Sequence, residues 1–207
     1  MTNNSQNEPS LYIHQYLQWN DNQVRLNGQL LFQFVGETSL DTCVEFYKNA
    51  AFNYLKFFKM DLLSKAAFLS AQMVIPKEIE ENKSKIATFL SSKSGCIDVD
   101  KKFEDSINDI ASPALFVYTL PNIMLGEICI VNGFKGEQMC TLSEDADSDW
   151  FEFYIGDLIR RRDTEAALCG HIEATEAGIN STMIWVSKQW SSIPFNMQNL
   201  QTIFKNR

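Results

Sequence analysis

The part of the sequence that most constrains the fold runs from residue 111 to residue 175, where segments typical of helices and strands alternate. In order, the segments are an apolar lead-in (Pro113–Tyr118), a helical run (Ile123–Val131), a turn (Asn132–Gly136), a strand (Glu137–Leu142), a second helix (Asp149–Arg162) and a strand (Glu165–Cys169) that ends on Gly170. A strand, a loop, a helix and another strand in this order predict a βαβ unit. The sequence therefore predicts an α/β fold built around this stretch.

The loop before the second helix, Ser143–Asp149, is where such a unit would carry chemistry. Free backbone N–H groups and the positive end of the helix dipole meet there, which favours an anion or an activated nucleophile. The loop, however, contains four carboxylates: Glu144, Asp145, Asp147 and Asp149. Aspartate and serine side chains accept hydrogen bonds from the first N–H groups of a helix. The loop therefore suits a helix cap better than an oxyanion site.

The order and spacing of small and polar residues around this unit resemble the N-terminal half of the β-ketoacyl synthases, the condensing enzymes of fatty-acid and polyketide synthesis. The matching residues are Thr119, Pro121, Asn122, Gly126, Gly133, Gly136, Asp163, Ala166 and Gly170. The resemblance covers about residues 55 to 175. It implies half of a thiolase-like architecture, an α/β fold with a mixed sheet and helices packed on its faces.

The departures from that family concern the catalytic residues. Counting from Gly136, the position of the family's nucleophilic cysteine is occupied by Asp145, and Cys140 lies five residues too early, inside a strand. Glu137 stands where the family has a proline. The family's catalytic histidines belong to its C-terminal half, which this sequence does not match. The resemblance therefore implies a non-catalytic subunit similar to the chain-length factors, including the short ones of aryl-polyene and flexirubin-type pigment synthesis.

A chain-length factor implies a partner, so we expect a heterodimer with a full-length ketosynthase, or a homodimer through the same edge. The residues expected at that interface or in the acyl pocket are Thr119, Pro121, Asn122, Gln138, Met139, Cys140 and Thr141. Arg160, Arg161 and Arg162 would complement the C-terminus of their helix, and they are also candidates for contact with an acyl carrier protein. No cofactor and no metal are expected.

Two other functions stay open at this point. One is an enzyme of unrelated chemistry centred on Asp145 and His171, which would require a substrate-sized pocket converging on Asp145. The other is a structural adaptor that binds carrier protein, which would show a large flat apolar face instead. His14 and His171 are the two histidines of the sequence. His14 lies in the first predicted strand, and no nearby residue has a rationale as a nucleophile for His171, so a structural role is the simpler interpretation of His171.

Composition excludes several other classes of protein. The chain has 207 residues, of which 45% are hydrophobic, enough for one ordinary core. We therefore expect a disordered lead at residues 1–10 and a single domain at 11–207. A net charge of −8 argues against nucleic acid, whose binding depends on phosphate neutralisation by lysine and arginine. No run of about 18 apolar residues and no signal peptide are visible, and the five cysteines form no CxxC pair, as in reduced cytoplasmic proteins.

The rest of the chain supplies the other elements of the predicted domain. An aromatic stretch, Leu40–Lys59, has helical periodicity and is interpreted as packing in a core or interface, or as the wall of an apolar pocket. The segment Ser92–Gly95 lacks the second glycine of a phosphate-binding loop, so we expect no nucleotide there. The remaining predicted strands are Leu11–Trp19, Ile86–Ser91 and Ser181–Lys188, and Gln29–Val35 is either a strand or a loop. Helices are predicted at Met60–Val74 and Lys101–Ile110, and the chain finishes with a polar end.

Two of the predicted helices lead to an expectation of association. Met60–Val74 and Ile123–Val131 are apolar on more than one side, and half of a condensing enzyme has few other elements to cover them. The strand Glu137–Leu142 carries few charges that would block pairing at an edge. We therefore expect an interface that buries at least ~2,000 Å² in total.

Overall fold

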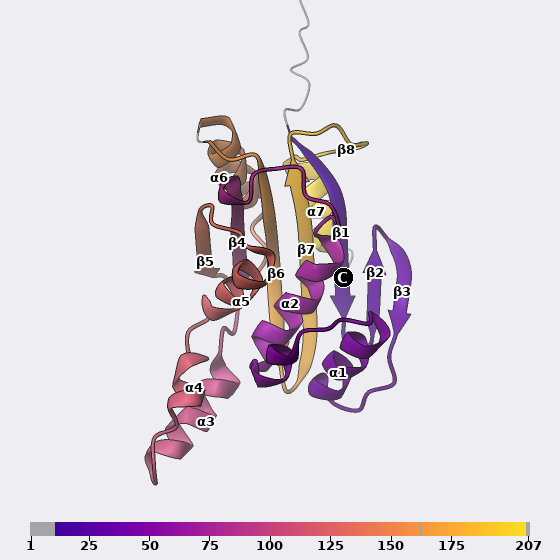
Figure 1. Ribbon diagram of the computed structural model, residues 1–207. Helices are drawn as coiled ribbons and strands as arrows, with labels where there is room; N and C mark the ends of the chain where they lie inside the picture. The colour runs from indigo at the N-terminus through magenta and orange to yellow at the C-terminus, as the bar shows by residue number, and fades with distance from the viewer. Residues whose placement is uncertain (1–10, 162, 206–207) are drawn as a thin grey trace, which may run out of the picture.

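The computed structural model describes residues 11–161 and 163–205, and these form one mixed sheet with helices on both faces (Figure 1). The strand order is β3-β2-β1-β7-β6-β4-β5, and β8 pairs with β1. The strands are β1 (Tyr12–Asn20), β2 (Gln23–Leu26), β3 (Gln29–Gln33), β4 (Ile86–Ser92), β5 (Gln138–Leu142), β6 (Ala166–Thr175), β7 (Gly178–Ser187) and β8 (Ile193–Pro194). Strand β4 is parallel to both β5 and β6, while the other pairs are antiparallel. The predicted mixed α/β sheet is therefore confirmed.

The helices divide between the two faces of the sheet. Helices α1, α2 and α5 lie on the face turned toward the viewer in Figure 1, and α6 and α7 lie behind the sheet. The described helices are α1 (Ser39–Asn49), η1 (Leu55–Lys59), α2 (Leu62–Val74), η2 (Lys83–Lys85), α3 (Ile97–Ile107), α4 (Pro113–Val117), α5 (Ile123–Asn132), α6 (Ser148–Arg161) and α7 (Met197–Lys205). Each face has its own hydrophobic cluster, because side chains alternate between the two sides of a strand.

Helix α2 lies at the centre of the larger cluster. Its cap is Asp61, whose carboxylate accepts hydrogen bonds from the N–H groups of Leu63 (3.1 Å) and Ser64 (3.2 Å). Ten of its 13 residues are buried. Three rings from the preceding segment, Phe52, Tyr54 and Phe57, contact Phe68 of α2 with centroids 5.5–6.0 Å apart.

This aromatic cover, defined as Phe52, Tyr54 and Phe57 together with Tyr47 of α1, corrects one expectation from the sequence. Helix α2 was expected to leave an apolar side uncovered, but the segment Leu40–Lys59 folds over it. Tyr47 stacks on Phe57 at 4.3 Å, and its hydroxyl accepts a hydrogen bond from the Tyr54 N–H at 2.6 Å. The aromatic stretch therefore packs in the core, as one of its interpretations held, and the chain covers its own central helix.

Two of the glycines that match the β-ketoacyl synthase pattern are required by the backbone geometry. Gly133 ends α5 in the left-handed region (φ 74°), where glycine avoids the steric cost of a side chain. A Cβ on Gly136 would lie 2.3 Å from the carbonyl oxygen of Ile86. Gly136 therefore allows the chain to approach the start of β4 closely, which sets up the parallel pairing of β5 with β4.

Several element boundaries differ from those predicted. Strand β6 does not end at Gly170 but continues to Thr175, because β7 begins at Gly178, earlier than expected, and pairs with it along its whole length. The lead-in Pro113–Tyr118 contains the helix α4 instead of leading directly into α5. The expected polar end contains α7. The expectations of a disordered lead at residues 1–10 and of a contact at Arg162 lie outside the described residues, and the single domain at 11–207 stays a prediction.

Candidate functional site

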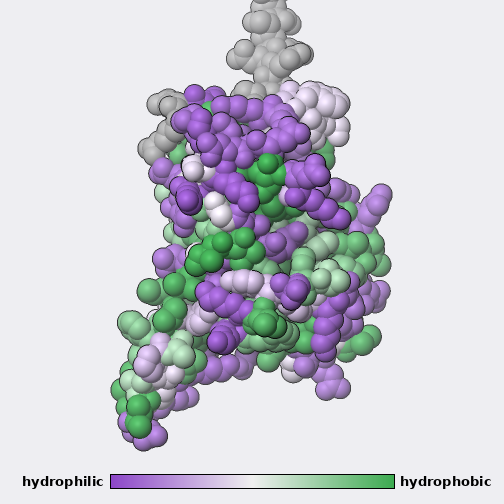
Figure 2. Space-filling model, viewed as in Figure 1, coloured by the Kyte–Doolittle hydropathy of each residue, from purple (hydrophilic) through white to green (hydrophobic). Residues whose placement is uncertain are grey.

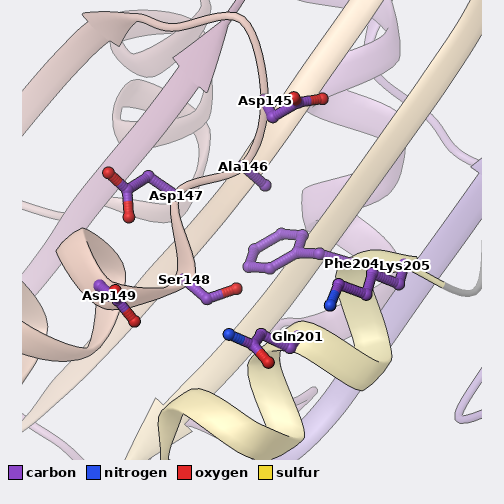
Figure 3. Close-up of a pocket in the computed structure, with 8 residues that line it drawn as sticks. All are labelled: Asp145, Ala146, Asp147, Ser148, Asp149, Gln201, Phe204 and Lys205. Atoms are coloured by element: carbon purple, nitrogen blue, oxygen red, sulfur yellow. The ribbon is translucent and has the colours of Figure 1, made fainter.

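The acidic loop borders a cavity of about 490 Å³ between the start of α6 and the end of α7 (Figure 3). Its lining consists of Asp145, Ala146, Asp147, Ser148 and Asp149 from the loop and Gln201, Phe204 and Lys205 from α7. The loop caps α6, as the sequence suggested. The capping side chain is Asp147, whose Oδ1 accepts from the Trp150 N–H at 3.0 Å.

Asp145 and His171, the residues on which an enzyme of unrelated chemistry would depend, do not both line this cavity. Asp145 is exposed and lines it, whereas His171 is 1% exposed, lies in β6 and is absent from the lining. His171 Nδ1 lies 2.8 Å from the Ser91 hydroxyl, so this ring is part of a buried polar pair. His14 is half-buried, and its Nε2 lies 3.1 Å from the Ser187 hydroxyl. The structure therefore gives the alternative chemistry a cavity but no histidine within it.

The cysteines are poorly suited to act as nucleophiles. Burial raises the pKa of Cys140 to about 11 and those of Cys43 and Cys96 to about 12. Burial also raises the pKa of Cys129 and Cys169. The thiolate is the reactive form of cysteine, so these thiols stay protonated near neutral pH.

The segment Ser92–Gly95 is occupied by a carboxylate from the chain itself. Glu173 Oε1 accepts hydrogen bonds from the Ser92 hydroxyl (2.7 Å), the Ser94 N–H (3.0 Å) and the Lys93 N–H. Burial alone would raise the pKa of Glu173, but these hydrogen bonds outweigh burial and hold the pKa below its usual value. The N–H groups that a phosphate would need are therefore already used.

Strand β5 is an edge of the sheet, since β4 is its one strand neighbour among the described residues. Gln138 and Leu142 at its ends are exposed, and Met139, Cys140 and Thr141 are half-buried. Helix α5 beside it presents Ile130, which is 67% exposed. Within residues 11–161 and 163–205, no second strand pairs with β5, and Leu142 and Ile130 are exposed at this edge.

The residues of the Thr119–Asn122 segment lie next to this edge or lead toward it. A Cβ on Gly95 would lie 3.1 Å from Pro121 and 3.3 Å from Leu142, so Pro121 and the end of β5 flank the same glycine. The Thr119 hydroxyl donates to the Phe116 carbonyl oxygen at 2.8 Å and ends α4. Asn122 is exposed and precedes the first residue of α5.

The sequence did not predict two apolar surfaces near the edge. Helices α3 and α4 form an arm that projects from the body, and hydrophobic residues lie among polar ones on it in the view of Figure 2. Its exposed apolar residues are Ile97, Ile107, Ile110, Phe116 and Val117, followed by Leu120. On α6, Trp150 (39% exposed) and Phe153 (59% exposed) stack at 5.7 Å. Two features of the sequence could have indicated these surfaces. Ser112-Pro113 interrupts the helical pattern of the arm, and Trp150 and Phe153 are aromatic residues three positions apart on one face of α6.

The arginine group is only partly described. Arg160 is exposed near the end of α6, and Arg161 is the last residue of that helix. Arg162 is not among the described residues. No cluster of three or more metal-ligating side chains occurs within residues 11–161 and 163–205, and no described helix is long and apolar enough to cross a membrane.

Comparisons with known proteins were made by sequence and by structure. No family model and no curated protein matches the sequence. Among solved structures, the chain is similar to the ishigamide ketosynthase/chain length factor (12% identity, TM-score 0.61), covering 86% of this chain and 62% of that chain. It is also similar to a chain in the complex of the ketosynthase ApeO with its chain length factor ApeC from Xenorhabdus doucetiae (13% identity, TM-score 0.59), covering 96% of this chain and 91% of that chain.

A third similar structure is a β-ketoacyl synthase from Burkholderia phymatum (10% identity, TM-score 0.62), with 88% of this chain and 60% of that chain covered. The chain has the thiolase-like fold of the ketosynthases. It spans less than two thirds of the ishigamide and Burkholderia chains. At identities this low, structural similarity shows the fold alone. The activity and the partners of this chain are therefore proposals.

Proposed function

We propose that this chain is a non-catalytic partner subunit of the chain-length-factor type, which pairs with a full-length β-ketoacyl synthase. The observation that carries the proposal is the open edge at β5. An unpaired strand edge with few charges is a template for pairing with another chain, and this one is flanked by the exposed side chains of Leu142 and Ile130. The partner completes the sheet edge, and this chain helps to wall the partner's acyl pocket.

The residues proposed for the interface and the acyl pocket are the two segments that meet at this edge. They are Thr119, Pro121 and Asn122 before α5, and Gln138, Met139, Cys140 and Thr141 in β5. The exposed apolar residues of the arm and the Trp150–Phe153 stack are proposed as further contacts, since exposed apolar patches mark interaction sites. With these parts the interface would bury at least ~2,000 Å² in total, the size of stable hetero-complexes.

The absence of catalysis is proposed from the side chains at the nucleophile position. Asp145 is an exposed carboxylate, and the described cysteines are held protonated by burial. Condensation needs an activated nucleophile with a general base in reach. One of the similar structures is a complex of the ketosynthase ApeO with its chain length factor ApeC, and the same division of labour is proposed here.

The proposal extends to the pathway and to the carrier protein. The partner would build a polyketide, aryl-polyene or fatty-acid-like chain on an acyl carrier protein in the cytoplasm. Arg160, Arg161 and Arg162 would contact that carrier, because carrier proteins are acidic and Arg160 is exposed.

Co-expression with a full-length ketosynthase encoded beside this chain tests the pairing. Sizing with light scattering should show one copy of each chain in a single species at micromolar concentration, and a homodimer when the ketosynthase is left out. A stable monomer that ignores the ketosynthase would refute the proposal.

Mass spectrometry tests the absence of catalysis. The isolated chain, incubated with acyl carrier substrates, should show no covalent acyl adduct, and Asp145→Cys alone should not restore turnover because the general base is still missing. A stoichiometric adduct on any cysteine of the unaltered chain would contradict the non-catalytic assignment.

A further inference from the structure

A second cavity lies where the starts of α1 and α2 face the arm, and it shares no lining residue with the cavity at the acidic loop. It has a volume of about 650 Å³ and is lined by 15 residues. Leu40, Leu62, Val99 and Leu115 are among the apolar ones. Ligand sites of proteins are typically cavities of about 300–1,000 Å³ with mainly apolar walls and a few placed polar groups. Size and lining are therefore those of a small-molecule site.

The most deeply buried charged group in the lining of this cavity is Lys65. It lines the cavity, is 5% exposed, and its ammonium lies 5.6 Å from the centroid of the Phe57 ring. Its Nζ donates to the Met60 carbonyl oxygen. An ammonium has three N–H donors, and within the described residues the Met60 oxygen is the one hydrogen-bond acceptor recorded for it. A buried donor without an acceptor costs free energy, so a ligand acceptor would stabilise this group.

The neighbouring carboxylate does not fill that role. Asp61 directs its two oxygens to the N–H groups of Leu63 and Ser64 at the start of α2. Burial lowers the pKa of Lys65 and raises that of Asp61, because a buried group favours its uncharged form.

The charges around the cavity determine the kind of ligand. Three lysines (Lys59, Lys65, Lys102) and three carboxylates (Asp61, Asp98, Glu176) line it, so the formal charges cancel. Lys102 pairs with Glu176 at 2.8 Å, and Asp98 accepts from the Glu176 N–H at 2.7 Å. An anionic ligand would approach Lys65 beside Asp61, so an uncharged acceptor fits better than a carboxylate.

We propose that this cavity binds an uncharged, mainly apolar molecule with one carbonyl oxygen, which accepts a hydrogen bond from Lys65. The apolar part lies against the side chains of α1, α2 and the arm. This site belongs to the isolated chain and requires no ketosynthase, so it stands or falls separately from the proposed pairing.

The test is titration of the isolated chain with methyl octanoate, followed by calorimetry and by methyl NMR. The account predicts saturable binding of one molecule, with shifts in the methyl signals of Leu40, Leu62 and Leu115. Octanoate, which has the same chain with a charged head, should bind at least tenfold more weakly. Equal or tighter binding of octanoate would overturn the choice of an uncharged ligand.

Variants locate the site. Lys65→Met keeps the length of the side chain and removes the donor, so affinity should fall about tenfold, the value of one hydrogen bond to a charged group. Leu115→Trp fills the cavity and should abolish binding. If either variant does not fold, Leu40→Trp at the half-exposed mouth should weaken binding with the fold intact.

Leu31→Trp on β3 is the matched control, because Leu31 is also partly exposed but lies outside the cavity. This variant should bind like the unaltered chain. No saturable binding, or binding that survives both Lys65→Met and a tryptophan in the cavity, would overturn the proposal.

Discussion

Helices α2 and α5 have similar apolar sequences, but in the structure the chain covers α2 and leaves α5 beside an open sheet edge. Both are apolar on more than one side, and both lie on the same face of the sheet. The aromatic cover closes α2 from within the chain, with Phe57 fully buried. Helix α5 keeps Ile130 exposed and lies beside the open edge of β5. The difference shows that apolar content indicates burial, whereas only the surrounding elements decide whether the chain or a partner provides it.

A polar link joins the two regions. Glu127 of α5 is 3% exposed and accepts from the Tyr118 hydroxyl at 3.0 Å. Its other oxygen lies 2.9 Å from Lys56 Nζ of η1, an ion pair without the alignment of a hydrogen bond. This link connects the segment that covers α2 with the helix that borders the edge.

The largest expected effect separates the covered region from the open one. Phe57→Ala removes a buried ring from the aromatic cover and should lower the free energy of unfolding by about 3–5 kcal/mol. Phe116→Ala on the arm, where the ring is 57% exposed, should cost less than about 1 kcal/mol. Urea unfolding of both variants measures the two values. Similar losses would mean that the arm is as much a part of the core as α2.

An intermediate effect is expected at the link. Lys56→Met leaves the Glu127 carboxylate buried without its cation and should cost about 2 kcal/mol in urea unfolding. The double variant Lys56→Met/Glu127→Gln removes the charge as well and should recover part of that loss. If the double variant loses the sum of the two single effects, the two side chains are not coupled.

A smaller effect is expected at the acidic loop. Asp147→Ala removes the cap of α6 and should lower the unfolding free energy by about 1 kcal/mol. Asp145→Ala, whose side chain is exposed, should leave stability unchanged. Both variants should leave complex formation with the ketosynthase intact. If the Asp145→Ala variant folds normally but its complex with the ketosynthase no longer makes the acyl product, the loop has a chemical role.

The sequence predicted the βαβ centre of the fold well because its signals are local. The turn glycines, the apolar run of α5 and the acidic cap of α6 each depend on neighbours in sequence. Helix α7 was missed because Met197–Lys205 has polar residues on most of its surface and packs by only a few side chains, Leu200, Ile203 and Phe204. The end of β6 was missed because pairing with β7 carries the strand through Gly170, and a Cβ there would lie 2.3 Å from the Thr182 carbonyl oxygen.

The candidate site was predictable only where it depends on position along the chain. The placement of Asp145 before α6 and of Cys140 within β5 followed from counting residues. The cover over α2, the projecting arm and the cavity at Lys65 depend on contacts between segments far apart in sequence. These contacts have no local signature, which is why the sequence left α2 with an apparent need for a partner.

The most direct measurement of the central claim compares one substitution at each edge of the sheet. Leu142 in β5 is 65% exposed and Leu31 in β3 is 39% exposed, and a lysine on an edge strand blocks pairing with another chain. In complexes with the full-length ketosynthase, sized with light scattering, Leu142→Lys should weaken association at least tenfold while Leu31→Lys leaves it unchanged. Association that survives Leu142→Lys but is lost in Leu31→Lys would contradict the assignment of β5 as the edge that binds the partner.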